Sequence, residues 1–294
     1  MTLNNLTRVI PVACVVVLVP LVLGFITWQF WFTPQIEALA VIEPNFFSAI
    51  KLEAKSAIVY NPETKEIIFA KNADEVLPIA SITKLMTAHL ANKNLTTETI
   101  TTSDGKRWSP RNLIDFTLVT SSNDGAERLA AAVAVKSNLP GTTFPQIMND
   151  EAATLGLTKT HFNNSTGLDA GNGLPGGEST ANEIAQLLSV ILNQEPEIVS
   201  ATTRNHITAQ SLDGQFLATN TNTAVGQIPG LRASKTGFTR SAGGSLAVAV
   251  DIGLNEPVIV VVLGSSEDGR ISDVEKLVSA TIGQTSQDKL KSLQ

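Results

Sequence analysis

The chain has 294 residues, a formal net charge of −6 and a single cysteine, Cys14. This length exceeds one typical domain of roughly 100–200 residues, so the chain can form one large domain or two closely packed subdomains. The mild acidity, without a basic stripe or a long Lys/Arg run, argues against a nucleic-acid partner. One cysteine excludes an internal disulfide, so disulfides do not indicate the compartment.

The first predicted element is a membrane helix. Residues 9–32 carry no charged side chain and exceed the length of about 20 apolar residues that spans a bilayer. Trp28 and Trp31 lie at one end, where an aromatic belt is expected. Arg8 lies at the other end, so the positive-inside tendency predicts that residues 1–8 are a cytoplasmic tail. We therefore expect a single-pass protein of the cell membrane whose remaining chain lies on the periplasmic or cell-wall side.

A cleaved signal peptide is the alternative for this segment. The apolar region of a signal peptide usually has about 7–15 residues, which is shorter than residues 9–32. The sequence Ala-Leu-Ala at residues 38–40 would nevertheless suit a signal peptidase. Length favours a retained anchor over a cleaved signal. Both alternatives predict that the rest of the chain is exported.

A linker and a hairpin follow the apolar segment. Residues 33–50, which include Pro34 and Pro44, are predicted to be the linker. Two short apolar runs at residues 56–60 and 67–70 then flank a polar Asn-Pro-Glu-Thr-Lys turn. Turn residues between β-prone runs indicate a hairpin.

Helical periodicity dominates the middle of the chain, from residue 81 to about residue 200, apart from a polar, Gly-rich stretch at 163–177. Beyond about residue 202 the β signals return, with apolar runs at 246–250 and 258–263. Strands, then helices, then strands predict a sheet assembled from both ends of the chain. The helical segment would be inserted as a second lobe, and a cleft between two lobes is a favoured ligand site.

The last predicted element is an amphipathic helix at residues 271–282, followed by a short tail at 286–294. The folded part of the chain is thus predicted to span residues 51–285. The fold class is α/β in the broad sense and α+β more narrowly. It comprises an antiparallel sheet flanked by helices, a mostly helical lobe and one preceding N-terminal transmembrane helix.

A Ser-x-x-Lys tetrapeptide is the first candidate for chemistry. Only the one formed by Ser81 and Lys84 follows a loop that ends in proline and opens an apolar-periodic helix, where both side chains share one face. Serine becomes a nucleophile when a base takes its proton, and lysine is such a base when burial or a cation lowers its pKa. By itself, the tetrapeptide is better explained by a helix N-cap with a solvated lysine, because the chain contains four copies, beginning at Ser48, Ser81, Ser103 and Ser286.

Two further motifs each occur once. Ser121 and Asn123 form a Ser-x-Asn corner between two helical runs, where a hydroxyl and an amide can face a cleft. Lys235 begins a Lys-Thr-Gly sequence in a β-prone segment, and its charge suits an anionic substrate terminus. It would also help to keep Lys84 neutral. Taken separately, helix capping explains the first motif and an exposed turn explains the second.

The three motifs together resemble those of the serine penicillin-recognising enzymes. Specifically, the chain resembles the low-molecular-mass D-alanyl-D-alanine carboxypeptidases of peptidase family S11, whose fold is of the β-lactamase/DD-peptidase type. The resemblance covers roughly residues 55–282. It includes the segments that flank the motifs, at residues 77–88, 164–169 and 179–181.

This resemblance implies a role for each matching residue. Ser81 would be the acylated nucleophile, Lys84 its base and Ser121 a proton-transfer group. The substrate would be a peptidoglycan stem peptide that ends in D-Ala-D-Ala, and β-lactams would acylate the same serine. No cofactor and no metal are implied. The implied substrate-binding groups are Asn123, Lys235, Thr236, Gly237 and Phe238, and the backbone N–H groups of Ser81 and Phe238 would form the oxyanion hole.

Three alternatives remain for the activity. Phe238 follows the Lys-Thr-Gly motif, where many carboxypeptidases of this family have His or another polar residue. The order Lys-Thr-Gly-Phe-Thr is more like the endopeptidase branch, which cuts peptidoglycan cross-links. A β-lactamase would need a deacylating base before the third motif, for which Glu178 is a weak candidate. An inactive wall-binding module is the third alternative, and the three intact motifs argue against it.

Charged residues outside the motifs give weaker signals. Near residues 220–222 the chain lacks an arginine that some family members use for the substrate carboxylate, so Arg232 and Arg240 are candidate replacements. The three histidines lack close metal-ligand spacing and are predicted to be packed or surface residues. They are His89, His161 and His206.

Overall fold

The computed structural model describes residues 45–137, 141–254 and 256–292. The predicted cytoplasmic tail, the predicted membrane anchor and most of the predicted linker therefore lie outside the described residues. Among the described residues, no helix has both the length and the apolar character needed to cross a bilayer.

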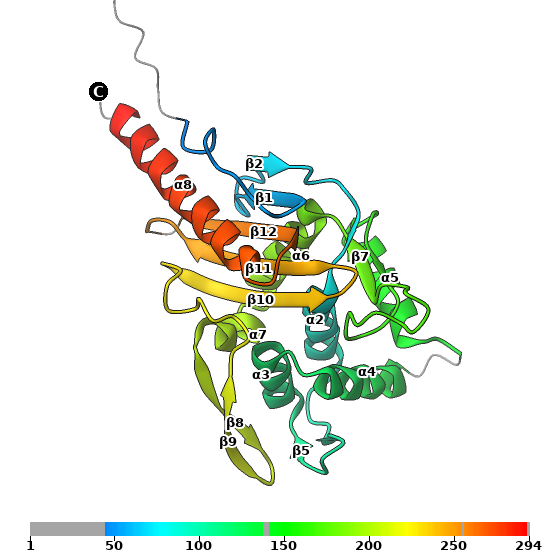
Figure 1. Ribbon diagram of the computed structural model, residues 1–294. Helices are drawn as coiled ribbons and strands as arrows, with labels where there is room; N and C mark the ends of the chain where they lie inside the picture. The colour runs from blue at the N-terminus through cyan, green and yellow to red at the C-terminus, as the bar shows by residue number, and fades with distance from the viewer. Residues whose placement is uncertain (1–44, 138–140, 255, 293–294) are drawn as a thin grey trace, which may run out of the picture. The chain divides into compact units, whose positions relative to one another are not determined.

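A five-stranded antiparallel sheet forms the centre of the fold, in the order β10-β11-β12-β1-β2 (Figure 1). Its members come from both ends of the described chain, which confirms the predicted α+β class. The pairing of Ser56 with Leu263 joins the first strand to the last. The strands are β1 (Ser56–Tyr60), β2 (Ile67–Lys71), β10 (Leu231–Thr239), β11 (Gly243–Asp251) and β12 (Pro257–Ser265).

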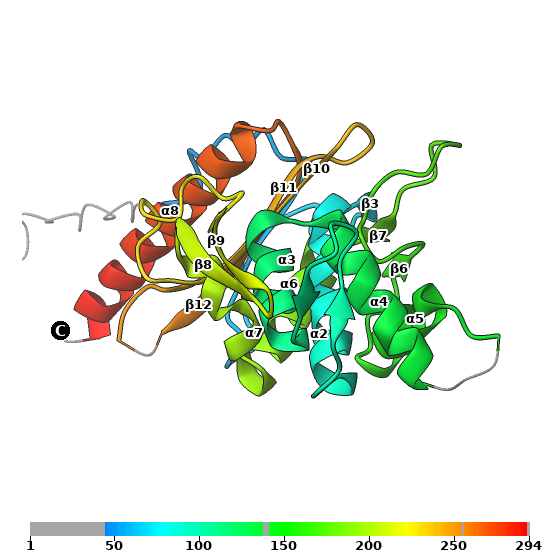
Figure 2. The ribbon, with the colours of Figure 1, turned by 90° about the horizontal axis from the view of Figure 1, so that it is seen from below.

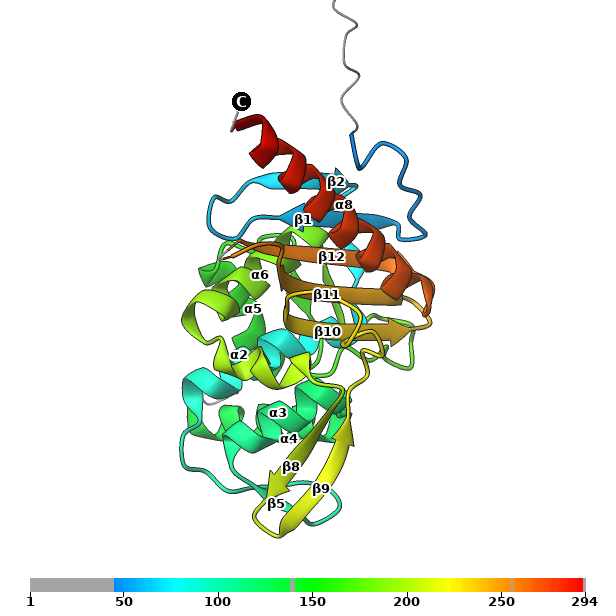
Figure 3. The same cartoon turned by 90° about the vertical axis from the view of Figure 1, so that its left-hand side faces the viewer.

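The two faces of this sheet are covered by different helices. Helix α8 (Gly269–Ser292) crosses one face, and α6 (Ala181–Gln194) lies behind the other (Figure 3). Because side chains alternate along a strand, Val260 packs toward α8 while Val261 joins the core beneath the helical lobe. The sequence predicted that the last helix ends at residue 282, but α8 continues to Ser292.

The helical lobe is inserted between β2 and β10, and Figure 2 shows its helices on the side of the sheet opposite α8. Its main helices are α2 (Lys84–Asn94), α3 (Pro110–Thr120), α4 (Asn123–Ser137) and α5 (Phe144–Thr154). The shorter helical elements are η1 (Ala80–Thr83), α7 (Glu197–Ser200) and η2 (Ala201–Thr203).

Short strands, which the sequence did not predict, connect these helices. Five of them have two or three residues: β3 (Leu77–Pro78), β4 (Ile100–Thr101), β5 (Arg107–Trp108), β6 (His161–Phe162) and β7 (Gly177–Ser179). A longer hairpin of β8 (His206–Ser211) and β9 (Gly214–Thr219) follows the lobe.

Candidate active site

Ser81 lies in the 3₁₀ turn η1, directly before α2 begins at Lys84. The sequence predicted that Ser81 opens the helix itself. The preceding residue, Ala80, has a positive φ of 48°, which is unfavourable for a residue with a side chain. Neighbouring backbone fixes this strained turn, because a Cβ on Gly167 would lie 1.8 Å from the carbonyl oxygen of Ala80. The turn therefore presents Ser81, which is partly exposed, in a strained and closely packed position.

Lys84 is fully buried, so it is not the solvated lysine of the capping explanation. Its Nζ atom lies 2.9 Å from Oγ of Ser81, so the three-residue spacing places the amine beside the hydroxyl. The same amine donates to Oδ1 of Asn123 at 2.8 Å and to the carbonyl oxygen of Thr166 at 2.7 Å. The bonds to Asn123 and Thr166 hold the amine beside the nucleophile Ser81.

Burial lowers the pKa of Lys84 to about 7, and the negative charge of Glu127 opposes this shift. A substantial share of the Lys84 side chains is therefore neutral near pH 7 and able to accept a proton. The sequence argument assigned part of this effect to the charge of Lys235. In the structure, burial is the main cause of the lowered pKa of Lys84.

The Ser-x-Asn corner belongs to the same cluster. Ser121 ends α3 in the left-handed region, with a φ of 58°, and its Oγ accepts a hydrogen bond of 3.0 Å from Nζ of Lys235. The middle residue, Ser122, caps α4 by accepting from the N–H of Gly125. Ser122 therefore provides the helix cap. The side chain of Ser121 contacts Lys235, and the side chain of Asn123 contacts Lys84.

Strand β10 contributes the third motif. Lys235 is buried, and its pKa is well below the usual value because of burial first, and then because of the nearby charges of Lys84 and Arg270. The hydroxyl of Thr236 lies 2.6 Å from that of Thr221. A Cβ on Gly237 would lie 2.9 Å from the carbonyl oxygen of Ile79. Glycine is therefore needed where β10 passes the nucleophile turn.

Two residues that carried no role in the sequence analysis support this strand. Arg270, near the start of α8, donates to the carbonyl oxygen of Gly237 at 2.8 Å. Asp169, in the Gly-rich stretch, accepts from the hydroxyls of Thr239 at 3.1 Å and Ser241 at 2.6 Å. Asp169 lay in a segment similar to the family, whereas nothing in the sequence around Arg270 marks it.

No hydrogen bond or ion pair within the described part of the chain joins the candidate replacement arginines to the motifs. Arg232 pairs with Asp251 at 3.4 Å, and Arg240 is exposed. Glu178, the candidate base of a β-lactamase, lies in β7 opposite Pro78. No hydrogen bond among the described residues joins its side chain to Ser81 or to Lys84.

The histidines remain outside the cluster. His89 is buried between Glu195 at 3.0 Å and Glu151 at 2.9 Å, as a packed and paired histidine. Within the described part of the chain, no group of three or more His, Cys, Asp or Glu side chains is arranged to hold a metal ion.

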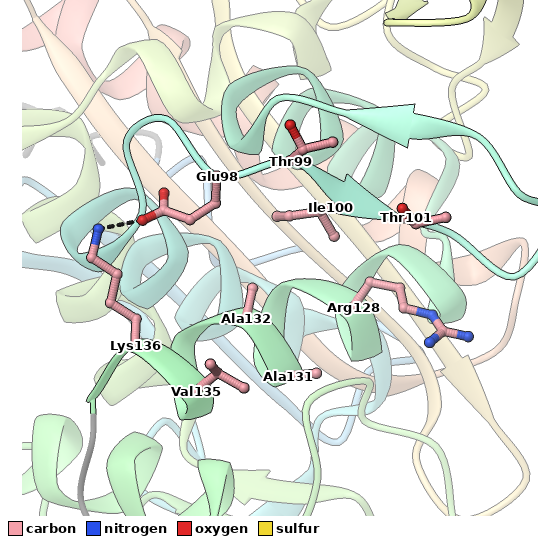
Figure 4. A pocket seen from close by; sticks show the side chains of 9 residues that line it. All are labelled: Glu98, Thr99, Ile100, Thr101, Arg128, Ala131, Ala132, Val135 and Lys136. Atoms are coloured by element: carbon pink, nitrogen blue, oxygen red, sulfur yellow. Dashed lines mark hydrogen bonds and ion pairs between the residues drawn. The ribbon is translucent and has the colours of Figure 1, made fainter.

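A hollow of about 450 Å³ lies elsewhere, between β4 and the outer face of α4 (Figure 4). Its floor is formed by Ile100 and Ala132. At one end Lys136 is paired with Glu98, and at the other end Arg128 is paired with Asp124 at 3.2 Å. Each of its charged side chains thus has an ion-pair partner, and the hollow lacks a nucleophile of the kind that Ser81 provides.

An antiparallel sheet with an inserted helical lobe, and a buried lysine beside a partly exposed serine where they meet, define a serine acyl-transfer class of site. Comparisons with known proteins agree with this class. The profile of the D-alanyl-D-alanine carboxypeptidase family matches residues 43–109 and 91–267. The chain belongs to that family, peptidase family S11.

Individual relatives include carboxypeptidases and endopeptidases. The chain is 27% identical to the D-alanyl-D-alanine carboxypeptidase DacF of Bacillus subtilis, over 81% of this chain and 64% of that protein. It is 31% identical to a D-alanyl-D-alanine endopeptidase of Pseudomonas aeruginosa, over 72% of each chain. The chain thus spans slightly less than two thirds of the length of DacF and of the carboxypeptidase DacD of Escherichia coli.

A solved structure shows the same fold. Penicillin-binding protein D2 of Listeria monocytogenes, in its ampicillin-bound form, superposes with a TM-score of 0.70 at 32% sequence identity. The match covers 79% of this chain and 98% of that chain.

Proposed function

We propose that this protein is a serine-type D-Ala-D-Ala carboxypeptidase that acts on peptidoglycan stem peptides through an acyl-enzyme. The observation that carries the proposal is the hydrogen bond of 2.9 Å between the buried amine of Lys84 and the hydroxyl of Ser81. A pKa of about 7 makes this amine a suitable base at neutral pH.

In the acylation step, Lys84, Ser81 and Ser121 act one after another. Neutral Lys84 takes the proton of Ser81, and the Ser81 oxygen attacks the carbonyl carbon of the penultimate D-alanine. The backbone N–H groups of Ser81 and Phe238 bind the resulting oxyanion. Ser121, in contact with Lys235, passes a proton to the leaving nitrogen as the C–N bond breaks. The proton that Lys84 took from Ser81 replaces the one that Ser121 gave up, so Lys84 is neutral again. The terminal D-alanine then departs as a free amino acid.

Deacylation reverses these roles with water as the nucleophile. Lys84 takes a proton from the water, which attacks the ester carbon, and the oxygen of Ser81 recovers its proton when the ester bond breaks. Asn123 binds the substrate backbone, while Lys235, Thr236 and the glycine that follows hold the carboxylate end against β10. A β-lactam acylates the same serine by the same first step, which agrees with the ampicillin-bound form of the Listeria relative.

Endopeptidase activity on cross-linked stems is the second candidate. Phe238 follows the Lys-Thr-Gly motif, and its side chain is 49% exposed beside the cluster. An apolar side chain there adds no charge that would select a free carboxylate over a longer peptide. The Pseudomonas endopeptidase, at 31% identity, supports this candidate.

One experiment distinguishes these activities. The full chain in detergent is incubated with a pentapeptide stem and with a purified cross-linked dimer, and the products are weighed by mass spectrometry. Free D-alanine from the stem indicates a carboxypeptidase, and monomers from the dimer indicate an endopeptidase. Ser81→Ala is the control. Turnover of both substrates by this variant at the wild-type rate would overturn the assignment of Ser81.

The proposed location follows from the apolar segment. We propose a single-pass cell-membrane protein anchored through residues 9–32, with the catalytic domain at 51–285 outside the cytoplasm. Peptidoglycan stems lie on that side of the membrane. Alkylation of Cys14 by a membrane-impermeant reagent in intact spheroplasts, at the rate of an exposed thiol, would contradict this location.

A further inference from the structure

The hairpin β8–β9 projects from the helical lobe, away from the five-stranded sheet (Figure 3). Its two strands pair only with each other among the described strands. Leu212 and Asp213 form the two-residue loop at its tip. One long edge of the hairpin is therefore a candidate for contact with another chain.

The hairpin is held rigidly on its inner side. The ring of Phe216 packs edge-on against Trp108 and Phe116, with centroids 5.5 Å apart in both pairs. At the tip, Arg107 donates to Asp213 through its side chain and its backbone. These contacts fix the hairpin, so its free edge has a defined shape before any partner binds.

The pairing register shows which backbone groups face outward. The N–H of Asn220 donates to the carbonyl oxygen of Asn205 at 2.9 Å, at the base of the hairpin. Hydrogen-bonded pairs alternate along an antiparallel ladder. In β9, Phe216 and Ala218 therefore bond to β8, whereas Gln215, Leu217 and Thr219 direct their N–H and C=O groups away from it.

These outward groups are unpaired. No hydrogen bond among the described residues reaches the backbone of Gln215, Leu217 or Thr219 outside the hairpin. The edge of β8, by contrast, lies toward α3 and β5, where Asn112 donates to the carbonyl oxygen of Gln210 at 2.8 Å. The free edge of the hairpin is thus the edge of β9.

The two outer strands of the five-stranded sheet have features that disfavour edge-to-edge pairing. The outer strand β2 follows a register shift at Val59/Tyr60 and ends in Lys71. The edge of β10 is covered by η1 and η2. Strand β9 has the sequence Gly-Gln-Phe-Leu-Ala-Thr, without a charge or a proline, and Leu217 at its centre is 70% exposed.

We propose that β9 pairs with β9 of a second copy of this chain, antiparallel about a two-fold axis at Leu217. In this register Leu217 lies opposite its symmetry mate, and Gln215 lies opposite Thr219 of the other copy. All outward N–H and C=O groups of the three residues are then paired, and none is left over. The strand is uncharged, so two copies meet without like-charge repulsion, and each Leu217 covers the other.

Residue 217 meets itself in this dimer, which provides a direct test. Self-association of the full chain in detergent is measured by sedimentation velocity over a range of protein concentrations. Leu217→Lys and Leu217→Glu each place like charges at the axis, so the Kd for dimerisation should rise at least about tenfold. A one-to-one mixture of the two variants should restore the dimer. Val135→Lys, at an 81% exposed position on α4, is the matched control and should leave the Kd unchanged.

Cysteine cross-linking tests the register independently. In a Cys14→Ser background, Leu217→Cys should form a disulfide-linked dimer under mild oxidation, whereas Val135→Cys should not. Labelling of Ser81 by a fluorescent penicillin should be the same in all variants, which shows that they are folded. A monomeric wild-type chain, a dimer insensitive to both charges at 217, or equal cross-linking at both positions would overturn the proposal.

Discussion

The hydroxyl of Ser121 and the amine of Lys235 are joined by a hydrogen bond of 3.0 Å across 114 residues of sequence. This contact connects the helical lobe to the edge strand of the sheet. It also places the Ser-x-Asn and Lys-Thr-Gly motifs in one cluster, with Lys84 bonded to Asn123 on the other side of the corner. The proton path proposed for the leaving group therefore depends on a contact between the two lobes.

Removing the Ser121 hydroxyl should separate its chemical role from its backbone role. We expect Ser121→Ala and Ser121→Gly to lose penicillin acylation to a similar extent, about 10²-fold or more, because both lack the proton-transfer group. Their stabilities should differ. The φ of 58° is strained for alanine and not for glycine, so the Ser121→Gly variant should be more stable than the Ser121→Ala variant by roughly 1 kcal/mol. Thermal unfolding gives the stability, and a glycine variant that acylates at the wild-type rate would exclude the hydroxyl from the mechanism.

The lowered pKa of Lys84 predicts the pH dependence of acylation. The neutral amine is the base, and its share rises with pH through a pKa of about 7, so the labelling rate should rise between about pH 6 and 8 and then level off. Lys84→Met should remove this rise and slow acylation by roughly 10²–10⁴-fold. Lys93→Met, which removes an exposed lysine of the same helix, is the control and should keep the profile.

The same shift predicts an effect on stability. Between about pH 7 and 10.5 the unfolded chain holds a proton on Lys84 that the folded chain has released. The free energy of unfolding of the wild type, relative to Lys84→Met, should therefore increase with pH over this window. Chemical denaturation at several pH values measures the difference. A difference that stays flat from pH 7 to 10.5 would mean that Lys84 keeps its ordinary pKa when folded.

Part of this arrangement could be predicted from local spacing, although the tetrapeptide alone favoured a helix cap and only the three motifs together indicated a site. Ser81 and Lys84 are three residues apart at a helix start, so local geometry brings their side chains together. The strand–helix–strand order likewise predicted a sheet built from both ends of the chain. Both inferences rest on periodicities of a few residues.

Contacts between distant segments could not be predicted in this way. Arg270 reaches Gly237 only because α8 folds back across the sheet. The sequence around Arg270 does not indicate this contact. The strained turn at Ala80 depends on Gly167, which belongs to a loop 87 residues later. Burial also decides the pKa of Lys84, and burial is a property of the whole fold rather than of a motif.

Gly237 provides a fourth prediction. A Cβ at this position would lie 2.9 Å from the carbonyl oxygen of Ile79 and 3.1 Å from the backbone nitrogen of Ser81, and neither atom belongs to a flexible side chain. Gly237→Ala should therefore push β10 away from the nucleophile turn and slow acylation by at least about tenfold. Gly105→Ala tests the effect of an added methyl group elsewhere, in open space but at a positive φ of 81°. It should cost stability without affecting acylation, and an unimpaired Gly237→Ala would show that the turn and the strand can move apart freely.

Arg270 provides the fifth prediction. Its guanidinium is buried, bonds to the carbonyl oxygen of Gly237 and lowers the pKa of Lys235 from a distance. Arg270→Met leaves that buried carbonyl without its donor, which should destabilise the protein by about 1–3 kcal/mol. Arg270→Lys keeps a positive charge and a donor, so it should recover part of the stability. If Arg270 also positions β10, both variants should weaken penicillin acylation, with Arg270→Lys the milder, because one amine replaces a rigid guanidinium fork. Loss of stability with an unchanged acylation rate in both variants would limit Arg270 to a structural role.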